Sequence, residues 1–237
     1  MNEISMILVF IGIILLPVFF FYGLYLISMY VYSSLSISVK KGMVLSFFSI
    51  FATFFPSLIL SSSNHIQLFT IGSWHISIHP IGLVFPILIS IILLIRSNQI
   101  NWSFLFLSLI PVCIMAYLMT TPVLEKGIVA PFPLWLFPPF MAAMITVLNK
   151  EKLKDNTCLY AFTLGVFGVI IGADVSHFPE LLSYPVSSSM HAIIGGASGV
   201  DLIFLSGMVS VVFSKLLLSF FETKTDAQVM KKIQTYV

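Results

Sequence analysis

The sequence predicts an all-α, polytopic membrane protein with about seven transmembrane helices, and three observations lead to this fold class. First, 59% of the 237 residues are hydrophobic and only 8% are charged, whereas soluble domains carry roughly 25% charged residues. Second, the apolar residues form runs close to the length of about 20 residues that crosses a bilayer. Third, the lysines stand between these runs, so no basic face for nucleic acid exists. We expect one transmembrane domain over residues 1–220 and a short cytoplasmic tail over 221–237.

Two long apolar helices are expected in the N-terminal part, from Ile4 to Val31 and from Met43 to Leu60. The first run is too long for a signal peptide and lacks a basic flank, so we interpret it as a retained helix. Between residues 66 and 78 apolar and polar side chains alternate around Ile71-Gly72-Ser73. This alternation predicts a small extramembrane hairpin at the membrane surface.

Proline interrupts several of the remaining helices, because it removes a backbone donor. Four prolines between Ile128 and Phe140 exclude a continuous helix there. We expect Pro131 to Pro139 to face the protein interior, since lipid cannot satisfy broken backbone. The other predicted helices are Ile81–Ile95 with Pro80 and Pro86 at its start, Trp102–Met119, a regular part at Phe140–Leu148, Thr157–Val175, and a seventh that starts between His191 and Gly199 and ends near Leu218.

The positive charges predict the orientation of these helices. With seven spans, ten basic residues fall on one side and only Lys126 falls on the other. Because cytoplasmic loops carry the excess of Lys and Arg, the N-terminus is expected outside and the C-terminus in the cytoplasm. The ten are Lys40, Lys41, Arg96, Lys150, Lys152, Lys154, Lys215, Lys224, Lys231 and Lys232.

Two aspartates inside apolar segments, Asp174 and Asp201, are the candidate catalytic residues. A charged residue in a membrane helix costs about 2.5–3.5 kcal/mol on insertion scales, so it marks a functional site by default. Both lie equally far from the middle of the connection between the sixth and seventh helices, which predicts similar depth. Two adjacent carboxyls would share one proton, as in aspartic-protease dyads. The alternative is that each aspartate caps a helix end or binds a backbone amide.

Glycines surround both aspartates and are expected to form the backbone of the site. Spacings of four residues let helix backbones approach closely, and this approach would bring the two carboxyls together. The glycines concerned are Gly168, Gly172, Gly195, Gly196 and Gly199.

No metal or cofactor is expected. His177 and His191 flank the outer link with Asp174 and Glu180, but their spacing matches no metal motif. His65, His75 and His79 are expected on the same outer face. Cys113 and Cys158 are isolated in or beside apolar segments and are interpreted as small hydrophobic residues.

Paired motifs in the second half carry a family resemblance. Gly172-Ala173-Asp174 ends one apolar segment; Gly195-Gly196-Ala197, Asp201 and Ile203-Phe204-Leu205-Ser206-Gly207 open the next. In these motifs and in the proline block, the chain resembles a family of uncharacterised archaeal and bacterial membrane proteins, domain of unknown function 1614. The resemblance covers most of the chain after about residue 40 and implies a multi-pass membrane protein without an assigned activity. Leu202, Ser198 and Gly199 depart from the family's usual residues.

A local similarity adds a mechanism. Gly199-Val-Asp-Leu-Ile-Phe-Leu-Ser206 is similar to the segment around the second aspartate of presenilin and signal-peptide-peptidase proteases. That resemblance implies that two aspartates on consecutive helices cut a transmembrane peptide. The chain departs from the pattern, because Val200 stands where those proteases have glycine, no Tyr-Asp precedes Asp174, and no Pro-Ala-Leu segment follows the last helix.

Three classes of function therefore remain open. An intramembrane aspartyl-protease-like enzyme, acting on a transmembrane peptide, explains the two aspartates and the glycines. A proton- or ion-coupled transporter or channel explains the aspartates and the broken helices, since transporters bind substrates at discontinuous helices. A non-catalytic membrane scaffold requires both aspartates to be structural. In each class the chain's first partner is the lipid bilayer.

Overall fold

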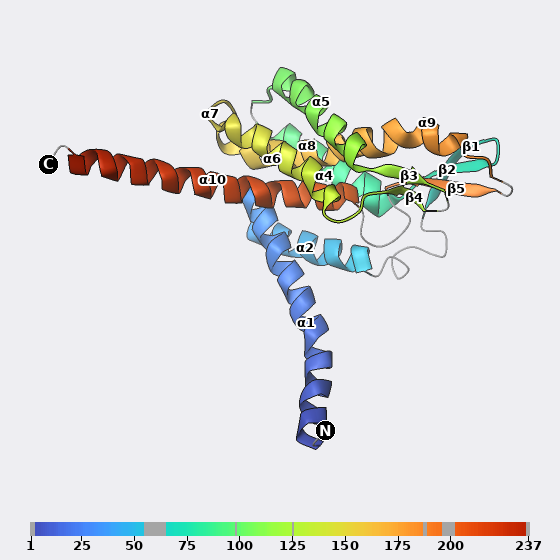
Figure 1. The fold of residues 1–237 in the computed structure, drawn as a ribbon, viewed down its shortest axis with the longest axis horizontal. Coiled ribbons are helices and arrows are strands. Elements are labelled where there is room, and N and C mark those ends of the chain that lie inside the picture. Colours follow the sequence, from blue (N-terminus) through green and yellow to red (C-terminus); the bar gives the residue numbers. More distant parts are fainter. Residues whose placement is uncertain are drawn as a thin grey trace.

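The computed structural model of the chain is mostly helical, and its helices gather into a bundle with a small sheet at one end (Figure 1). The structure describes residues 3–54, 65–97, 99–124, 126–186, 189–195 and 202–235; for 3–14, 49–54 and 222–235 it describes the backbone alone. In this part of the chain four helical stretches are long and apolar enough to cross a membrane. They are Leu15–Ser34, Trp102–Met119, Lys150–Ser183 and Leu202–Phe221, and two shorter apolar helices lie at Pro80–Arg96 and Leu134–Leu148.

These apolar helices indicate a membrane location, and they confirm the predicted helical class. Each of the seven predicted segments contains a helix. A count of seven membrane crossings stays a prediction, because only four of the described stretches have the required length. The end of the second predicted helix, near Leu60, lies outside the described residues.

Helix α8 (Thr157–Val169) forms the centre of the bundle. Twelve of its 13 residues are buried, as expected for a helix that is hydrophobic on all sides. It packs against α4 (Phe85–Arg96), α5 (Trp102–Met119), α6 (Phe137–Leu148) and α10 (Leu202–Thr235). The predicted bounds of α5 are confirmed at both ends. This arrangement makes α8 the element that positions any site built between the neighbouring helices.

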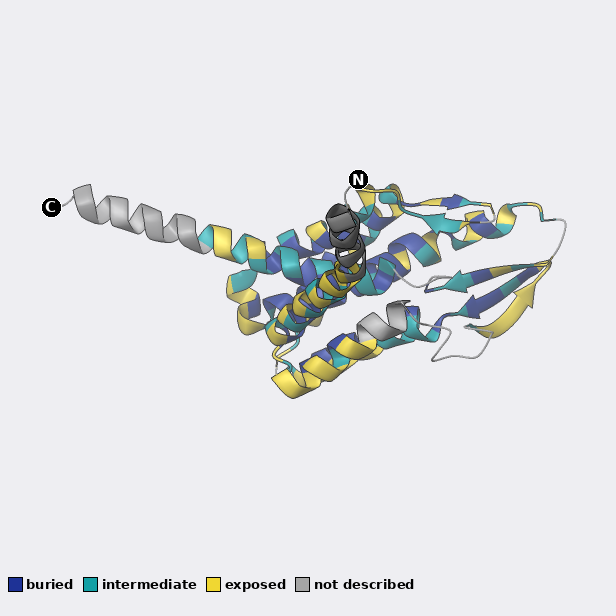
Figure 2. Ribbon diagram, turned by 90° about the horizontal axis from the view of Figure 1, so that it is seen from below, coloured by how far each residue is buried: buried dark blue, intermediate teal, exposed yellow. Residues whose placement is uncertain are grey.

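The N-terminal helix α1 (Glu3–Ser34) projects away from the bundle, whereas α2 (Val39–Phe54) lies along it (Figure 1). Large apolar side chains cover α1 from Leu15 onward, and Figure 2 shows this part as mostly exposed. Leu16 is 71% exposed and Phe19 is 67% exposed, while Tyr32 at the bundle end is fully buried. An exposed apolar surface of this kind is what a helix surrounded by lipid requires.

A three-stranded sheet lies at one end of the bundle. β1 (Ile66–Ile71) and β2 (Trp74–Ile78) form the antiparallel hairpin that the sequence predicts. β5 (Met190–Ile194) pairs with β2 in parallel. A start of the seventh helix at His191–Ile194 is wrong, because these residues belong to strand β5, whereas 196–199 of the expected start lie outside the described residues. The described part of α10 begins at Leu202.

A second, two-stranded sheet follows α5. β3 (Thr121–Val123) and β4 (Gly127–Val129) pair in antiparallel fashion, and α9 (Ser176–Ser183) packs against both. The sequence analysis did not predict this hairpin. Both sheets lie at the same end of the molecule in Figure 1 and in Figure 2.

Irregular helical turns flank several helices. A wide π-helical turn η1 (Pro80–Val84) precedes α4, and a second one, η4 (Ile170–Val175), joins α8 to α9. The sixth helix thus reaches Val175 as predicted and continues beyond it. At the other end, α8 is preceded by a short helix, α7 (Lys150–Leu153), and a 3-10 turn, η3 (Lys154–Asn156).

The proline block departs from two expectations. Its only helical turn before α6 is the 3-10 turn η2 (Leu134–Leu136), so the absence of continuous helix is confirmed, but α6 begins at Phe137 and not at Phe140. The expected interior position is wrong: Phe132 is 78% exposed, and of the four prolines only Pro138 and Pro139 are buried. Both stand in the first turn of α6, where proline's missing N–H leaves no bond unmade.

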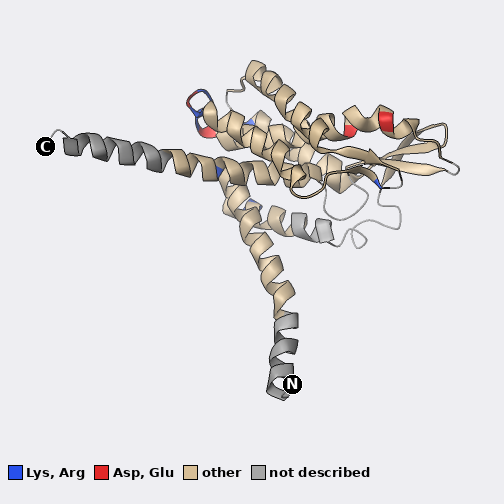
Figure 3. Ribbon diagram, in the orientation of Figure 1, with Lys and Arg blue, Asp and Glu red and all other residues tan. Residues whose placement is uncertain are grey.

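Charged residues are rare on the described bundle and concentrate at its ends (Figure 3). The largest group lies at the turn formed by α7 and η3, which carries Lys150, Glu151, Lys152, Lys154 and Asp155. This turn is at the opposite end of α8 from η4. The bundle therefore has a basic turn at one end and the sheets at the other.

Candidate functional site

The π-helical turn η4 at the end of α8 carries Asp174. Such wide turns leave backbone carbonyls without their usual partners and occur often at functional sites. The Ser176 hydroxyl donates to the carbonyl oxygen of Ile171 at 2.7 Å, and the Ser176 backbone N–H donates to the same oxygen. The side chain of Asp174 is half-buried. The turn thus presents a carboxyl group at the point where the central helix changes direction.

The carboxylate of Asp174 accepts a hydrogen bond from the backbone N–H of Gly195. Gly195 directly follows β5 and has a φ of +92°, a conformation that glycine adopts without strain. A Cβ at this position would lie 2.7 Å from the backbone nitrogen of Leu83 in η1. Gly195 therefore forms a turn that packs against η1, the π-helical turn before α4. It does not belong to a face on which two helices pack.

A second contact closes the same junction. The backbone N–H of His79 donates to the carbonyl oxygen of Ile194 at 2.9 Å, and the N–H of Gly82 donates to Nδ1 of His79 at 3.0 Å. Burial, and then the charge of His65, lowers the pKa of His79. A neutral imidazole at this position suits its role as acceptor. The π-helical turns η1 and η4 and the end of β5 therefore meet at one junction. Asp174, in η4, belongs to the part of this junction that continues from α8.

Three of the predicted site residues, Asp201, Gly196 and Gly199, lie outside the described residues. Helix α10 begins at Leu202, so Asp201 directly precedes it in the sequence. Gly195 stands six residues before Asp201. Asp174 therefore lies at Gly195, the first residue of the segment that ends at Asp201. The distance between the two carboxyls stays untested.

The glycines of α8 allow close helix approach as predicted, but they do so toward a different partner. A Cβ on Gly168 would overlap Val112 of α5, and one on Gly172 would overlap the Cys113 carbonyl of the same helix. The close contact between α8 and α10 instead uses Gly165 and Gly207. A Cβ on Gly165 would lie 2.8 Å from the Ser206 carbonyl oxygen, and one on Gly207 would lie 2.7 Å from Val166.

His177 is buried, with 4% of its surface exposed. Its Nε2 lies 3.1 Å from the Tyr117 carbonyl oxygen, its Nδ1 lies 3.3 Å from Glu180, and its ring stacks on that of Tyr117. His177 thus lies inside α9 and not in an exposed link. His177 instead fastens α9 to the end of α5.

His191 has different neighbours. Its ring centroid lies 4.8 Å from that of His65 and 5.1 Å from that of His75. Desolvation, followed by the charges of His65 and His75, lowers the pKa of His191. The combination of His177, His191, Asp174 and Glu180 that the sequence places together is therefore not one cluster, because the two histidines belong to separate groups.

Sequence reasoning missed a line of buried hydroxyls along α10. Ser206, Ser210 and Ser214 are fully buried. Ser210 donates to the Ala161 carbonyl of α8 at 2.7 Å, and Ser214 lies 3.5 Å from the Thr146 hydroxyl of α6. Within the described part of the chain the Ser206 hydroxyl has no hydrogen-bond partner. The spacing of four residues was the available signal, because it places all three on one side of a helix.

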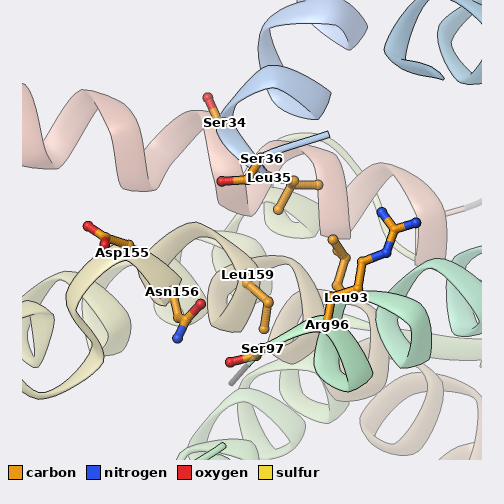
Figure 4. A pocket seen from close by; sticks show the side chains of 9 residues that line it. All are labelled: Ser34, Leu35, Ser36, Leu93, Arg96, Ser97, Asp155, Asn156 and Leu159. Carbon is orange, nitrogen blue, oxygen red and sulfur yellow. The ribbon is translucent and has the colours of Figure 1, made fainter. Parts of the chain in front are cut away.

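A cavity of about 230 Å³ lies at the opposite end of α8 from Asp174. Figure 4 shows Arg96 and Leu93 at the end of α4 on one side of it and Asp155 and Asn156 on the other. The side chain of Arg96 points away from Asp155 in that view. This cavity is therefore separate from the junction around Asp174.

The family comparison follows the same part of the chain. A family model described as "Protein of unknown function (DUF1614)" matches residues 31–213. The chain belongs to this family. No curated protein and no solved structure matches it. The matched residues contain η4, the β5 strand, the start of α10 and both aspartates, so DUF1614 membership covers the whole candidate site.

Proposed function

We propose that this DUF1614 protein is an intramembrane aspartyl-protease-like enzyme whose two carboxyls are Asp174 and Asp201. The single observation that carries the proposal is the hydrogen bond from the Gly195 N–H to Asp174. It joins the break in α8 to the segment that ends, six residues later, in Asp201. The proposal assigns two carboxylates to one site at the sheet end of the bundle.

The packing of α8 on α10 supports a similar depth for the two aspartates. Gly207 lies against Phe162 and Val166, and the two helices run in opposite directions. Counted from Gly207, Asp201 lies six residues earlier in the sequence. Counted from Val166 and Phe162, Asp174 lies eight and twelve residues later. The remaining offset of two to six residues corresponds to roughly 3–9 Å at the helical rise of about 1.5 Å per residue.

Two carboxyls at such a site divide the work of amide hydrolysis. One carboxylate removes a proton from a water molecule, whose oxygen attacks the scissile carbonyl carbon. The other, protonated, donates a hydrogen bond to the carbonyl oxygen and so stabilises the charge that develops there. The C–N bond then breaks, and the departing nitrogen takes up the proton. The substrate class is a transmembrane peptide, because the site lies on membrane-spanning helices.

The proposal includes an orientation with the N-terminus outside and the C-terminus in the cytoplasm. The basic turn formed by α7 and η3 lies at the bundle end opposite the sheets (Figure 3), and basic loops favour the cytoplasmic side. In this orientation Asp174 and the sheets are on the outer side. A substrate would therefore be cut near its outer membrane boundary.

Cross-linking tests the proximity of the two positions. Cys113 and Cys158 are first replaced by serine, and Asp174→Cys is combined with Asp201→Cys. A bifunctional thiol reagent with a reach of about 5 Å, matched to the Cα separations of bridged cysteines, should link the two positions within one chain. Asp174→Cys with Asp155→Cys is the matched control, since Asp155 lies at the far end of α8. A link in the control only, or in neither pair, contradicts the paired site.

Activity is tested by sequencing new peptide termini in membranes from cells that carry the wild-type or variant chain. Asp174→Asn keeps an oxygen that accepts from the Gly195 N–H, so the fold should survive while cleavage within apolar segments disappears. Asp201→Asn should give the same loss, and Asp155→Asn should give none. Identical termini from wild-type and Asp174→Asn membranes would refute catalysis at this carboxyl.

Proton-coupled transport is the second candidate, and the buried hydroxyls favour it. Ser206, Ser210 and Ser214 extend from the aspartate end of α10 toward its middle, and the Ser206 hydroxyl meets no partner among the residues that the structure describes. Polar groups inside a membrane bundle can line an ion pathway. Proton flux into liposomes that depends on Asp174 and Ser206, without any peptide cleavage, would support transport over proteolysis.

A further inference from the structure

The cavity of about 230 Å³ at the bundle end opposite the sheets takes no part in the proposed protease site. Three segments enclose it: the link between α1 and α2, the end of α4, and the turn η3 with the first residues of α8. Figure 4 shows these segments around the cavity. Three leucines form its apolar wall, and its polar side chains are Ser34, Ser36, Arg96, Ser97, Asp155 and Asn156.

Three of these side chains can donate hydrogen bonds but meet no acceptor within the described part of the chain. They are the Arg96 guanidinium, the Ser36 hydroxyl and the Asn156 amide. Asn156 directly precedes α8, yet its side chain does not cap that helix. The Ser97 hydroxyl is a fourth donor, and its contact with the Gln99 carbonyl oxygen is long, at 3.4 Å. Since each of these groups can donate, the cavity suits a ligand that offers several acceptor oxygens.

The charges around the cavity favour an anion. In the described parts of its enclosing segments and of α7, the acidic side chains are those of Glu151 and Asp155 alone. Asp155 is exposed, and in Figure 4 its carboxyl points away from Arg96, so it leaves the charge of the guanidinium uncompensated. Lysines surround the same end of the bundle, as Figure 3 shows for the turn formed by α7 and η3. They are Lys40, Lys41, Lys150, Lys152 and Lys154.

Two exposed aromatic side chains mark the depth of the cavity. Tyr30 lies one helical turn before Ser34 in α1, and Trp102 is the first residue of α5, six residues after Arg96. In membrane proteins Trp and Tyr concentrate at the level of the lipid headgroups. A phospholipid headgroup is therefore the ligand within reach, and its phosphate supplies both the acceptor oxygens and the negative charge.

The size of the cavity fits a headgroup and excludes acyl chains. Sites that enclose a drug-sized molecule measure roughly 300–1,000 Å³, and this cavity is smaller. Three residues after Ser36, α2 begins at Val39 and presents an open apolar surface. That surface is lined by Met43, Val44, Phe47 and Phe48. The acyl chains of a lipid can lie along it while the headgroup occupies the cavity.

We propose that this cavity binds the headgroup of an anionic phospholipid, with Arg96, Ser36 and Asn156 donating to its phosphate oxygens. The planar guanidinium binds two oxygens of one phosphate at once, a geometry that lysine lacks. Basic pockets between transmembrane helices hold anionic headgroups in this way. The bound lipid joins the α1–α2 link to the ends of α4 and α8, and it thereby holds the base of the projecting helix α1 against the bundle. The argument does not depend on the proposed protease activity.

Titration of the full-length chain with lipid tests this site. The protein is purified in a neutral detergent, freed of lipid, and mixed with micelles that contain rising fractions of dioleoylphosphatidylglycerol. This lipid should raise the melting temperature to a plateau, since a ligand that binds the folded state stabilises it, and native mass spectrometry should show one tightly held lipid per chain. Dioleoylphosphatidylcholine has the same acyl chains and no net charge, and it should stabilise the chain less.

Two outcomes of this titration overturn the proposal. Equal stabilisation by the two lipids would show that the cavity does not select an anionic headgroup. Soluble glycerol 3-phosphate separates the lipid from a free phosphate as the source of the ligand. If it stabilises the lipid-free chain as much as phosphatidylglycerol does at the same concentration, the cavity takes a soluble phosphate and not a lipid.

Variants identify the binding residues. Arg96→Gln is the main variant, because Arg96 is exposed and its replacement should leave the fold intact; it should weaken phosphatidylglycerol binding by about 10-fold or more, through loss of charge-assisted hydrogen bonds. Arg96→Lys keeps the charge and should lose less, and Asn156→Ala should weaken binding without removing a helix cap. Lys126→Gln removes one positive charge at the sheet end and is the matched control. Unchanged affinity in Arg96→Gln, or an equal loss in Lys126→Gln, would refute the site.

Discussion

Replacement of Gly172 by alanine tests whether the close contact between η4 and α5 fixes the position of Asp174. A Cβ on residue 172 would overlap the Cys113 carbonyl oxygen and would lie 2.7 Å from the Cys113 Cα and 2.8 Å from the Ala116 Cβ. Two of these three atoms are backbone and cannot rotate away. Overpacking costs about 1–3 kcal/mol, and we take the upper half of this range. Removing glycine from a helical turn returns about 0.5–1 kcal/mol, so the net loss should be about 1–2.5 kcal/mol.

Gly23 supplies the matched control for this substitution. It lies in α1, and a Cβ there would meet no atom within 4 Å. Gly23→Ala should therefore leave the chain as stable as the wild type, or more stable by about 0.5–1 kcal/mol. The free energy of unfolding is measured in mixed micelles by titration with a denaturing detergent and tryptophan fluorescence. If Gly172→Ala and Gly23→Ala unfold at the same midpoint, α5 does not approach η4 as described, and the reasoning fails.

Three further predictions follow from the fold. In intact cells Lys152→Cys should not react with an impermeant thiol reagent, because the basic turn is expected in the cytoplasm; reaction there would reverse the orientation. His79→Ala should lower the free energy of unfolding by about 1–3 kcal/mol, since it leaves the buried Gly82 N–H without its acceptor. Because burial lowers the pKa of His79 below the ordinary 6.5, the unfolded chain binds more protons just below that pH. Stability measured against pH should therefore fall as the pH drops below 6.5 in the wild type, and this part of the fall should be absent in His79→Ala.

The elements that the sequence predicts well are those with a strong local signal. The bounds of α5 agree at both ends because Asn101 caps its start, with its side chain accepting from the Phe104 N–H, and an apolar run of helical length follows. The hairpin of β1 and β2 is predicted because alternation of apolar and polar side chains is particular to strands. Such patterns act within a few residues, so one sequence suffices to detect them.

The elements that escape prediction depend on contacts between distant segments. Met190–Ile194 is a short apolar run that fits a helix start as well as a strand, and its pairing with β2 decides the matter. The spacing of Gly168 and Gly172 predicts a close helix contact but cannot name the partner, which is α5. The sequence predicts an interior position for Pro131 to Pro139 because interrupted helical backbone needs hydrogen-bond partners that lipid cannot supply. That argument applies only at membrane depth, and Phe132 is instead exposed at the end of α6.

Both π-helical turns of the described bundle lie at one end, and this asymmetry is the strongest reason to seek function there. The turn η1 opens α4, η4 closes α8 and η2 precedes α6, all on the side of the sheets. Each break frees backbone groups that would be costly to leave unsatisfied in a membrane. Polar side chains at this end, Asp174 and His79 among them, supply the missing partners. We therefore expect substitutions at the sheet end to change activity, and substitutions at Asp155 to change at most the stability of the fold.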